Sequence, residues 1–120
     1  MTDLKRMILD AKDSKTEKIE VPEWGVTVNV TTMSGVDRDS FEGEMHALKG
    51  GLDNLRSRLV VRCLCDDEGK RIFDDSDAVE LGKKSGVVLC RLFDIARKLN
   101  PLSEDDVEKL AGNSESDQSE

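Results

Sequence analysis

The sequence is short of the residues from which most active sites are built. It has no tyrosine, one histidine and 3% aromatic residues among its 120 residues. An acid/base enzyme needs titratable groups that converge, and no Ser-His-acid or Cys-His arrangement has local support here. His46 falls beside the apolar stripe of its predicted helix, which is typical of a solvated residue. We therefore expect a binding protein that has no cofactor and catalyses no reaction.

Cysteine is also scarce, and its spacing does not favour a metal or disulfide site. Cys63 and Cys65 are one residue apart, whereas structural zinc pairs are usually two to four apart. The odd count of three, with no secretory start at the N-terminus, predicts a reducing cytoplasm. Cys63 and Cys90 lie on apolar faces, where a free cysteine acts as a small hydrophobe.

The acidic residues after Cys65 invite a calcium interpretation, which their spacing does not support. In an EF-hand loop counted from Asp66, the sixth position would be glycine and the twelfth glutamate. They are Arg71 and Asp77. Turn formation and helix capping explain these acidic residues better, so no metal site is predicted. The alternative is a weakly bound, adventitious ion.

Long apolar runs are absent, and the net charge is negative. The run Met7–Leu9 near the start is far shorter than the roughly 20 residues of a membrane span. Of the net charge of −8, −6 lies after Leu102, so the remaining chain is nearly neutral. Negative charge repels phosphate backbones and anionic lipids, so neither nucleic acid nor a membrane is an expected partner.

Turn residues and alternating apolar residues predict a β-hairpin near the N-terminus. Residues 19–21 and 26–30 alternate at a period of two, and Pro22-Glu23-Trp24-Gly25 between them is turn chemistry. A lone hairpin is marginal in water, so it must lie on the helices. The polar residues 12–18 before it are expected to be loose.

Apolar residues at helical spacing predict the remaining elements. A short helix begins at Thr2 or Asp3, and a capping box at Ser34 opens the first main helix. The apolar positions are Leu4, Met7, Ile8 and Ala11; Phe41, Met45 and Leu48; Leu52, Leu55, Leu59, Val60, Val61, Cys63 and Leu64; and Val88, Leu89, Leu92, Phe93, Ile95, Ala96 and Leu99. Ile72-Phe73 is expected to fold back as a short extended piece.

Caps and helix breakers set the later boundaries. Asp74 to Asp77 offer caps for a short helix through Leu81, and Ser85 can cap the long helix that Asn100-Pro101 stops. Ser103 opens a second capping box, with Val107 and Leu110 in a final turn or two.

Together these elements predict a mainly α (α+β) protein. We expect a small helical bundle with an N-terminal β-hairpin and a disordered acidic C-terminal tail. The predicted parts are an amphipathic arm with a polar linker at 1–18, a single domain at 19–111 and the tail at 112–120.

Some large apolar side chains lie where a small core need not reach. The candidate partner-binding residues are Leu4, Met7 and Ile8 on the arm, Trp24 at the hairpin turn and Met33 before the first main helix. The alternative is that the arm and Trp24 cover the bundle, since single surface hydrophobes are ordinary.

Several short patterns, in order along residues 19–110, resemble the tail assembly chaperones of long-tailed, siphophage-type bacteriophages and prophages. They are Val21-Pro22-Glu23-Trp24-Gly25, the Ser34-Gly35 start followed by Arg38 and Phe41, Leu59-Val60 leading to Cys65-Asp66-Asp67-Glu68-Gly69, Phe73, and Leu92-Phe93 to Leu99-Asn100 with Leu102-Ser103-Glu104. None of these patterns is a catalytic signature.

The resemblance implies a function in tail morphogenesis. Such chaperones form homo-oligomers around the long tape-measure protein, keep it soluble and hand it to the tail tube protein, and they are absent from the mature virion. Many also exist in a longer, frameshifted form whose extension is thought to recruit the tube protein. The alternative, from a different class, is a structural virion or head–tail connector component.

Overall fold

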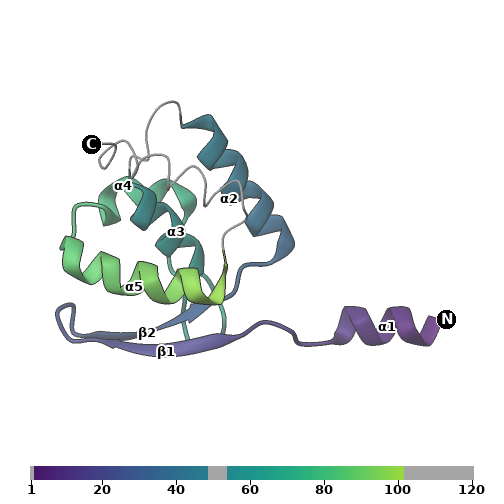
Figure 1. The fold of residues 1–120 in the computed structure, drawn as a ribbon. Helices are drawn as coiled ribbons and strands as arrows, with labels where there is room; N and C mark the ends of the chain where they lie inside the picture. The colour runs from purple at the N-terminus through teal and green to yellow at the C-terminus, as the bar shows by residue number, and fades with distance from the viewer. Residues whose placement is uncertain (1, 49–53, 102–120) are drawn as a thin grey trace, which may run out of the picture.

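A computed structural model describes residues 2–48 and 54–101 of the chain. Its elements, in chain order, are α1 (Thr2–Asp10), β1 (Thr16–Val21), β2 (Val26–Thr31), α2 (Gly35–Ala47), α3 (Leu55–Cys63), β3 (Leu64–Cys65), the 3-10 helix η1 (Asp75–Asp77), α4 (Ala78–Leu81) and α5 (Gly86–Leu99). The predicted α+β class is confirmed. The helices other than α1 gather over the hairpin, and α1 stands apart on the N-terminal arm (Figure 1).

The hairpin forms where the sequence places it, with an earlier start. β1 and β2 are antiparallel, pairing Thr16 with Thr31 and Val21 with Val26. Gly25 ends the turn at a φ of +68°, a conformation that glycine adopts without a steric penalty. The prediction of a loose segment was wrong for residues 16–18, because pairing with β2 draws these polar residues into the strand.

A third strand was not expected from the sequence. Leu64 was assigned to the stripe of α3, but this helix ends at Cys63. Leu64 and Cys65 pair antiparallel with Val30 and Asn29, giving the sheet order β1-β2-β3. The chain then turns back, and the N–H of Ile72 donates to the Leu64 carbonyl at 3.2 Å.

The core lies between the sheet and the helices. Its fully buried side chains include Val21 and Val30 from the sheet, Phe41 from α2, Leu59 from α3 and Leu92 from α5. Ile95 and Leu99 pack against this core and remain partly exposed. The apolar residues predicted for the helix α5 thus face the core, whereas α3 is the helix that packs against α2, α4, α5 and β2.

The predicted caps differ in how they are made. The Ser34 hydroxyl accepts from the N–H of Asp37 at 3.1 Å, as the capping box requires. The N–H of Asp74 donates to the Asp77 carboxylate at 2.8 Å before η1 and α4. Ser85 precedes α5 but makes no side-chain cap hydrogen bond. The predictions for Leu52, for the capping box at Ser103 with Val107 and Leu110, and for the tail 112–120 lie outside the described residues.

Candidate functional site

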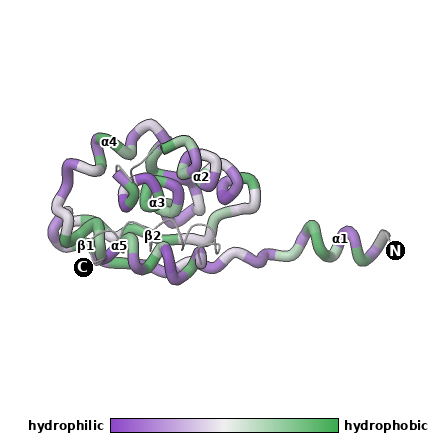
Figure 2. The backbone as a smooth tube through the Cα atoms, turned by 45° about the horizontal axis from the view of Figure 1, so that its top comes forward, coloured by the Kyte–Doolittle hydropathy of each residue, from purple (hydrophilic) through white to green (hydrophobic). Residues whose placement is uncertain are grey.

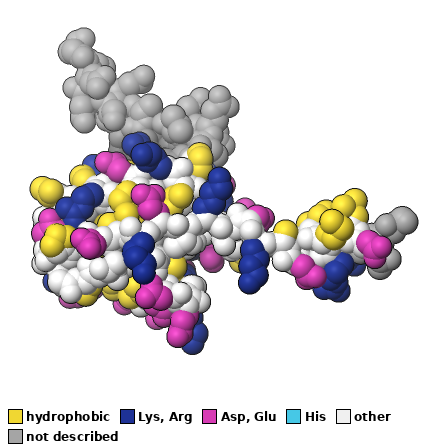
Figure 3. All heavy atoms as spheres, turned by 90° about the horizontal axis from the view of Figure 1, so that it is seen from below, with side chains coloured by type: hydrophobic (Ala, Val, Ile, Leu, Met, Phe, Trp, Pro, Cys, Tyr) yellow, Lys and Arg dark blue, Asp and Glu magenta, His cyan; other side chains and the backbone are white. Residues whose placement is uncertain are grey.

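The helix α1 presents an exposed apolar face. Leu4, Met7 and Ile8 are 61%, 66% and 65% exposed. Their spacing of three and four residues places them on one side of a helix. Hydrophobic side chains gather on one side of α1 and charged ones on the other (Figure 3). Hydrophobic and hydrophilic residues alternate along the helix (Figure 2).

Within residues 2–48 and 54–101, nothing from the core of the domain packs on this face. The hydrophobic core of the described residues runs from Val21 to Ala96 and includes nothing from α1, and the residues that pack against it begin at Ile19. The alternative, that the arm covers the bundle, is thus not seen among the described residues. Isolated helices below about 12–15 residues are marginal in water, and α1 has nine. A contact with another polypeptide would supply the packing that α1 lacks.

Trp24 lies at the second apolar site, the hairpin-tip groove. This groove has a volume of about 300 Å³ and is lined by Trp24, Phe73, Asp77, Glu80, Leu81 and Lys84. Trp24 is partly buried against the core. At this groove the turn of the hairpin therefore lies beside the loop before η1 and the end of α4.

A bidentate ion pair holds the turn that carries Trp24. The Arg91 guanidinium on α5 donates to both carboxylate oxygens of Glu23, at 3.0 and 2.8 Å. Hydrogen bonds from Arg91 are the main cause that lowers the pKa of Glu23 from 4.5 to about 2. Because the pair is exposed to solvent, its contribution to stability is small.

The Glu23–Arg91 pair predicts a pH dependence of stability. The folded pKa of Glu23 is lowered, so the contribution is present above pH 4.5 and is lost as the pH falls toward about 2. Glu23→Gln should abolish the contribution of the ion pair to stability. The difference in the free energy of unfolding between the wild type and E23Q should therefore shrink as the pH falls from 4.5 to about 2. Urea unfolding of both proteins at several pH values measures it. A difference that stays constant from neutral pH to pH 2 would contradict the assignment.

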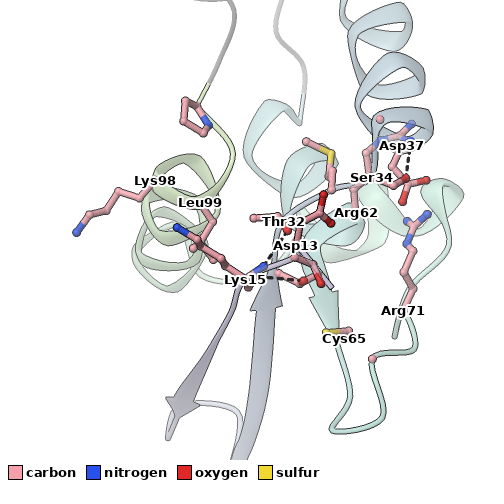
Figure 4. A pocket seen from close by; sticks show the side chains of 16 residues that line it. Asp13, Lys15, Thr32, Ser34, Asp37, Arg62, Cys65, Arg71, Lys98 and Leu99 are labelled. Carbon is pink, nitrogen blue, oxygen red and sulfur yellow. Dashed lines mark hydrogen bonds between the residues drawn. The ribbon is translucent and has the colours of Figure 1, made fainter. Parts of the chain in front are cut away.

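Met33 lies at a third place, beside a wide hollow of about 890 Å³ where the arm joins the domain. The side chains around this hollow are mostly polar or charged, among them Asp13, Lys15, Arg62 and Arg71 (Figure 4). Met33 packs partly against the core, and its N–H donates to the Asn100 side chain at 2.6 Å. The five predicted partner-binding residues are therefore distributed over three places and do not form one surface.

The sequence did not reveal every apolar residue at these places. Leu9 is 63% exposed on α1, and Phe73 and Leu81 line the hairpin-tip groove. The run Met7–Leu9 gave a signal for Leu9. The groove had no comparable signal, because its walls come from separate parts of the chain.

A buried arginine ties α2, α3 and η1 together. Arg62 is 4% exposed and bridges Glu44 at 3.0 Å and Asp75 at 3.2 Å. Arg58 also pairs with Glu44, and Arg71 with Asp75 at 2.8 Å. Each cation faces a carboxylate, so the network is best explained as a cross-link between elements.

The remaining polar candidates have structural roles. Burial raises the pKa of Cys63 to about 12, so this thiol is neutral and a poor nucleophile at neutral pH. His46 is exposed on α2, as expected. Asp66 accepts from the N–H groups of Glu68 and Lys70 at 2.9 Å, which is turn chemistry.

A metal site and a membrane span are both absent from the part of the chain that the structure describes. Among residues 2–48 and 54–101, no three His, Cys, Asp or Glu side chains are grouped so that they could hold a metal ion. Nor is any helix in these ranges both long and apolar enough to cross a membrane.

Comparison with known proteins gives matches of two kinds. Residues 3–110 match the family described as phage tail assembly chaperone. A solved structure of the bacteriophage HK97 tail assembly chaperone is similar with a TM-score of 0.58 and 22% identity, covering 87% of this chain and 100% of the other. At this identity the second match shows a shared fold. No curated protein matches the chain.

Proposed function

The chain belongs to the phage tail assembly chaperone family, and from this premise we propose that it binds the tape-measure protein. In this proposal it keeps the tape measure soluble while the tail tube is assembled and catalyses no reaction. The observation that carries the proposal is the exposed apolar face of α1, formed by Leu4, Met7 and Ile8. Trp24 and Met33 are proposed as further contacts.

The chemistry of this face suits a helical partner. A tape measure is a long polypeptide with exposed apolar stretches, and amphipathic helices bind through anchors three and four residues apart. Burying a Leu, Met or Ile side chain contributes roughly 1.5–3 kcal/mol. A few such contacts give modest affinity, and the acidic residues of the chain would keep the complex dissolved.

Repetition along one long partner would raise the affinity. If several copies bind adjacent segments, each bound copy increases the effective concentration of the next. We therefore propose a homo-oligomer on the tape measure, in the host cytoplasm and absent from the mature virion. Contact with the tail tube protein would come through a longer, frameshifted form.

Purification of a complex tests this function. Co-expression with the tape-measure protein of the same phage should yield a particle that contains both chains and elutes together in size-exclusion chromatography. The α2 variant Val36→Glu should behave as the wild type, because Val36 is 78% exposed and belongs neither to α1 nor to the hairpin-tip groove. Separate elution of the two folded proteins would contradict the proposal.

The second candidate function is a structural component of the virion or head–tail connector. It is supported by the small size of the chain and by its hairpin. Mass spectrometry of purified particles distinguishes the two functions, because a chaperone should be absent from them. Detection of the chain at a fixed copy number per particle would favour the structural role.

A further inference from the structure

We infer that two copies of the chain pair through the outer edge of β1, about a two-fold axis at Ile19. The inference goes beyond the proposed function, because this contact needs neither a tape measure nor the helix α1. It rests on an open strand edge and on the order of the charges along that edge.

The strand β1 lies at an edge of the described sheet. The sheet order is β1-β2-β3, so within residues 2–48 and 54–101 no strand pairs with the other side of β1. The helices α3 and α5 pack on β2, and β1 runs along the outer side of the hairpin (Figure 1). Such an edge presents backbone N–H and C=O groups that can pair with another strand.

The register shows which backbone groups of β1 face outward. The Lys15 carbonyl accepts from the N–H of Thr32 at 3.0 Å, and hydrogen-bonded positions alternate along an antiparallel pair. The even-numbered residues Thr16, Lys18 and Glu20 therefore direct their N–H and C=O groups away from β2. A second strand can bond to these groups without disturbing the hairpin.

An antiparallel pair centred on Ile19 matches the side chains of β1. It places Lys18 of each copy opposite Glu20 of the other, and both residues have outward backbone groups that the two strands exchange. The two Ile19 side chains, each partly exposed beside the core, meet at the axis. Opposite charges and apolar side chains that face each other across strands both stabilise a sheet.

The neighbouring registers are opposed by charge. An antiparallel pair centred on Glu17, Lys18 or Glu20 would place that residue opposite its own copy. Like charges directly opposite each other destabilise a sheet. Charged side chains on an edge strand usually discourage pairing. Here they discourage the neighbouring registers and leave the one centred on Ile19, so the charge pattern selects a second copy as the occupant.

The ammonium of Lys18 already has one contact within the copy. It lies 3.4 Å from the Asp67 carboxylate, and both side chains are well exposed. Such a pair is weak, and an ammonium has three donors, so it can bond to a second carboxylate. In the pairing Lys18 would lie between Asp67 of its own copy and Glu20 of the other.

The contact is isologous and closes on itself. Both copies use the same strand edge, so the product is a dimer that does not grow further through this surface. The two three-stranded sheets would join into one continuous sheet, with the helices of both copies on the same side. Only β1 pairs, so the apolar face of α1 stays open to the tape measure, and this last step alone rests on the proposed function.

Sedimentation equilibrium of the full chain tests the pairing. All proteins carry Met7→Glu/Ile8→Glu, so that the apolar face of α1 does not contribute. This parent should dimerise as its concentration rises toward about 1 mM, since a small interface gives weak affinity. Lys18→Glu and Glu20→Lys should each weaken dimerisation by at least about 10-fold. Lys70→Glu makes the same charge change as Lys18→Glu beyond β3, at the opposite edge of the sheet, and should leave dimerisation unchanged.

Two outcomes of this measurement would overturn the inference. One is a folded parent that remains monomeric at about 1 mM. The other is dimerisation of Lys18→Glu equal to that of the parent.

Exchange of the two charges separates strand pairing from a general effect of charge. Lys18→Glu/Glu20→Lys restores opposite charges across the axis, so it should dimerise as the parent does. An equal mixture of the two single variants should form a heterodimer, which isotope labelling of one variant identifies by mass. A double variant or a mixture that stays monomeric, while all proteins are folded by circular dichroism, would contradict the register.

A cysteine at Ile19 tests the position of the axis. A non-hydrogen-bonded pair holds its Cβ atoms at about 4.5 Å, which permits a disulfide. Ile19→Cys in a Cys90→Ser background should form a cross-linked dimer on mild oxidation, since Cys63 and Cys65 are buried. Glu17→Cys in the same background should not, because its two copies would lie roughly 14 Å apart. Equal cross-linking of the two variants, or none of Ile19→Cys, would exclude this axis.

Discussion

Replacing Asn100 with leucine is expected to lower the free energy of unfolding by about 3 kcal/mol. Asn100 is 5% exposed at the end of α5. Its Oδ1 accepts from the N–H of Met33 at 2.6 Å, and its Nδ2 donates to the carbonyls of Thr31 at 3.2 Å and Ala96 at 3.0 Å and to the Cys63 sulfur at 3.5 Å. Leucine would remove the partner of the Met33 N–H and the Thr31 carbonyl, both part-buried, at about 1–3 kcal/mol for each group, whereas the Ala96 carbonyl keeps the Asn100 N–H at 2.9 Å.

Urea unfolding followed by far-UV circular dichroism measures this loss. The slope with urea should be unchanged, since the same surface is exposed on unfolding. Val87→Ala on the same helix is the control, because Val87 is exposed and its replacement should change stability by at most about 0.5 kcal/mol. A loss below about 1 kcal/mol for Asn100→Leu would show that solvent replaces these hydrogen bonds.

Placing glutamates at both Met7 and Ile8 is expected to weaken binding to the tape measure by at least about 100-fold. Each replacement removes an apolar contact of roughly 1.5–3 kcal/mol and brings a charge to the interface. Glutamate is a good helix former, so α1 itself should persist. The stability of the domain should not change, because the core of the described chain includes no residue of α1.

Titration of a labelled tape-measure segment with the wild type, M7E/I8E and V36E measures the three affinities. V36E adds one negative charge, against two in M7E/I8E, at another exposed apolar position, on α2. Equal affinities for all three proteins would place the tape-measure contact elsewhere on the chain.

The elements that could be predicted from the sequence are those with local causes. Proline, glycine and the alternation of valines determine the hairpin, and the Ser34 cap and its following apolar stripe determine the start of α2. The exposure of α1 also has a local basis, since a short amphipathic arm before a polar linker has few ways to reach a core.

The parts that were missed depend on distant residues. Leu64 and Cys65 continue the apolar pattern of α3, and they become a strand only because β2 lies beside them. Strand formation depends on such cross-strand neighbours more than on intrinsic preference. The hairpin-tip groove likewise exists only after Trp24, Phe73 and Leu81 meet in the folded chain.

The asparagine that stops α5 shows the same limit. Asn100 before Pro101 indicated a helix end, and the helix does end at Leu99. Its contacts with Thr31 at the end of β2 and with Met33 just after that strand could not be inferred from spacing. The sequence therefore predicted the end of the helix but not the tertiary contacts of the Asn100 side chain.

The soluble fraction of the tape-measure protein tests the central claim most directly. We expect this protein to sediment as aggregate when it is produced alone and to stay in the supernatant, with its intact mass unchanged, when the chain is produced with it. Aggregation of the tape measure beside a folded, soluble and abundant chain would contradict the account, as would a changed mass.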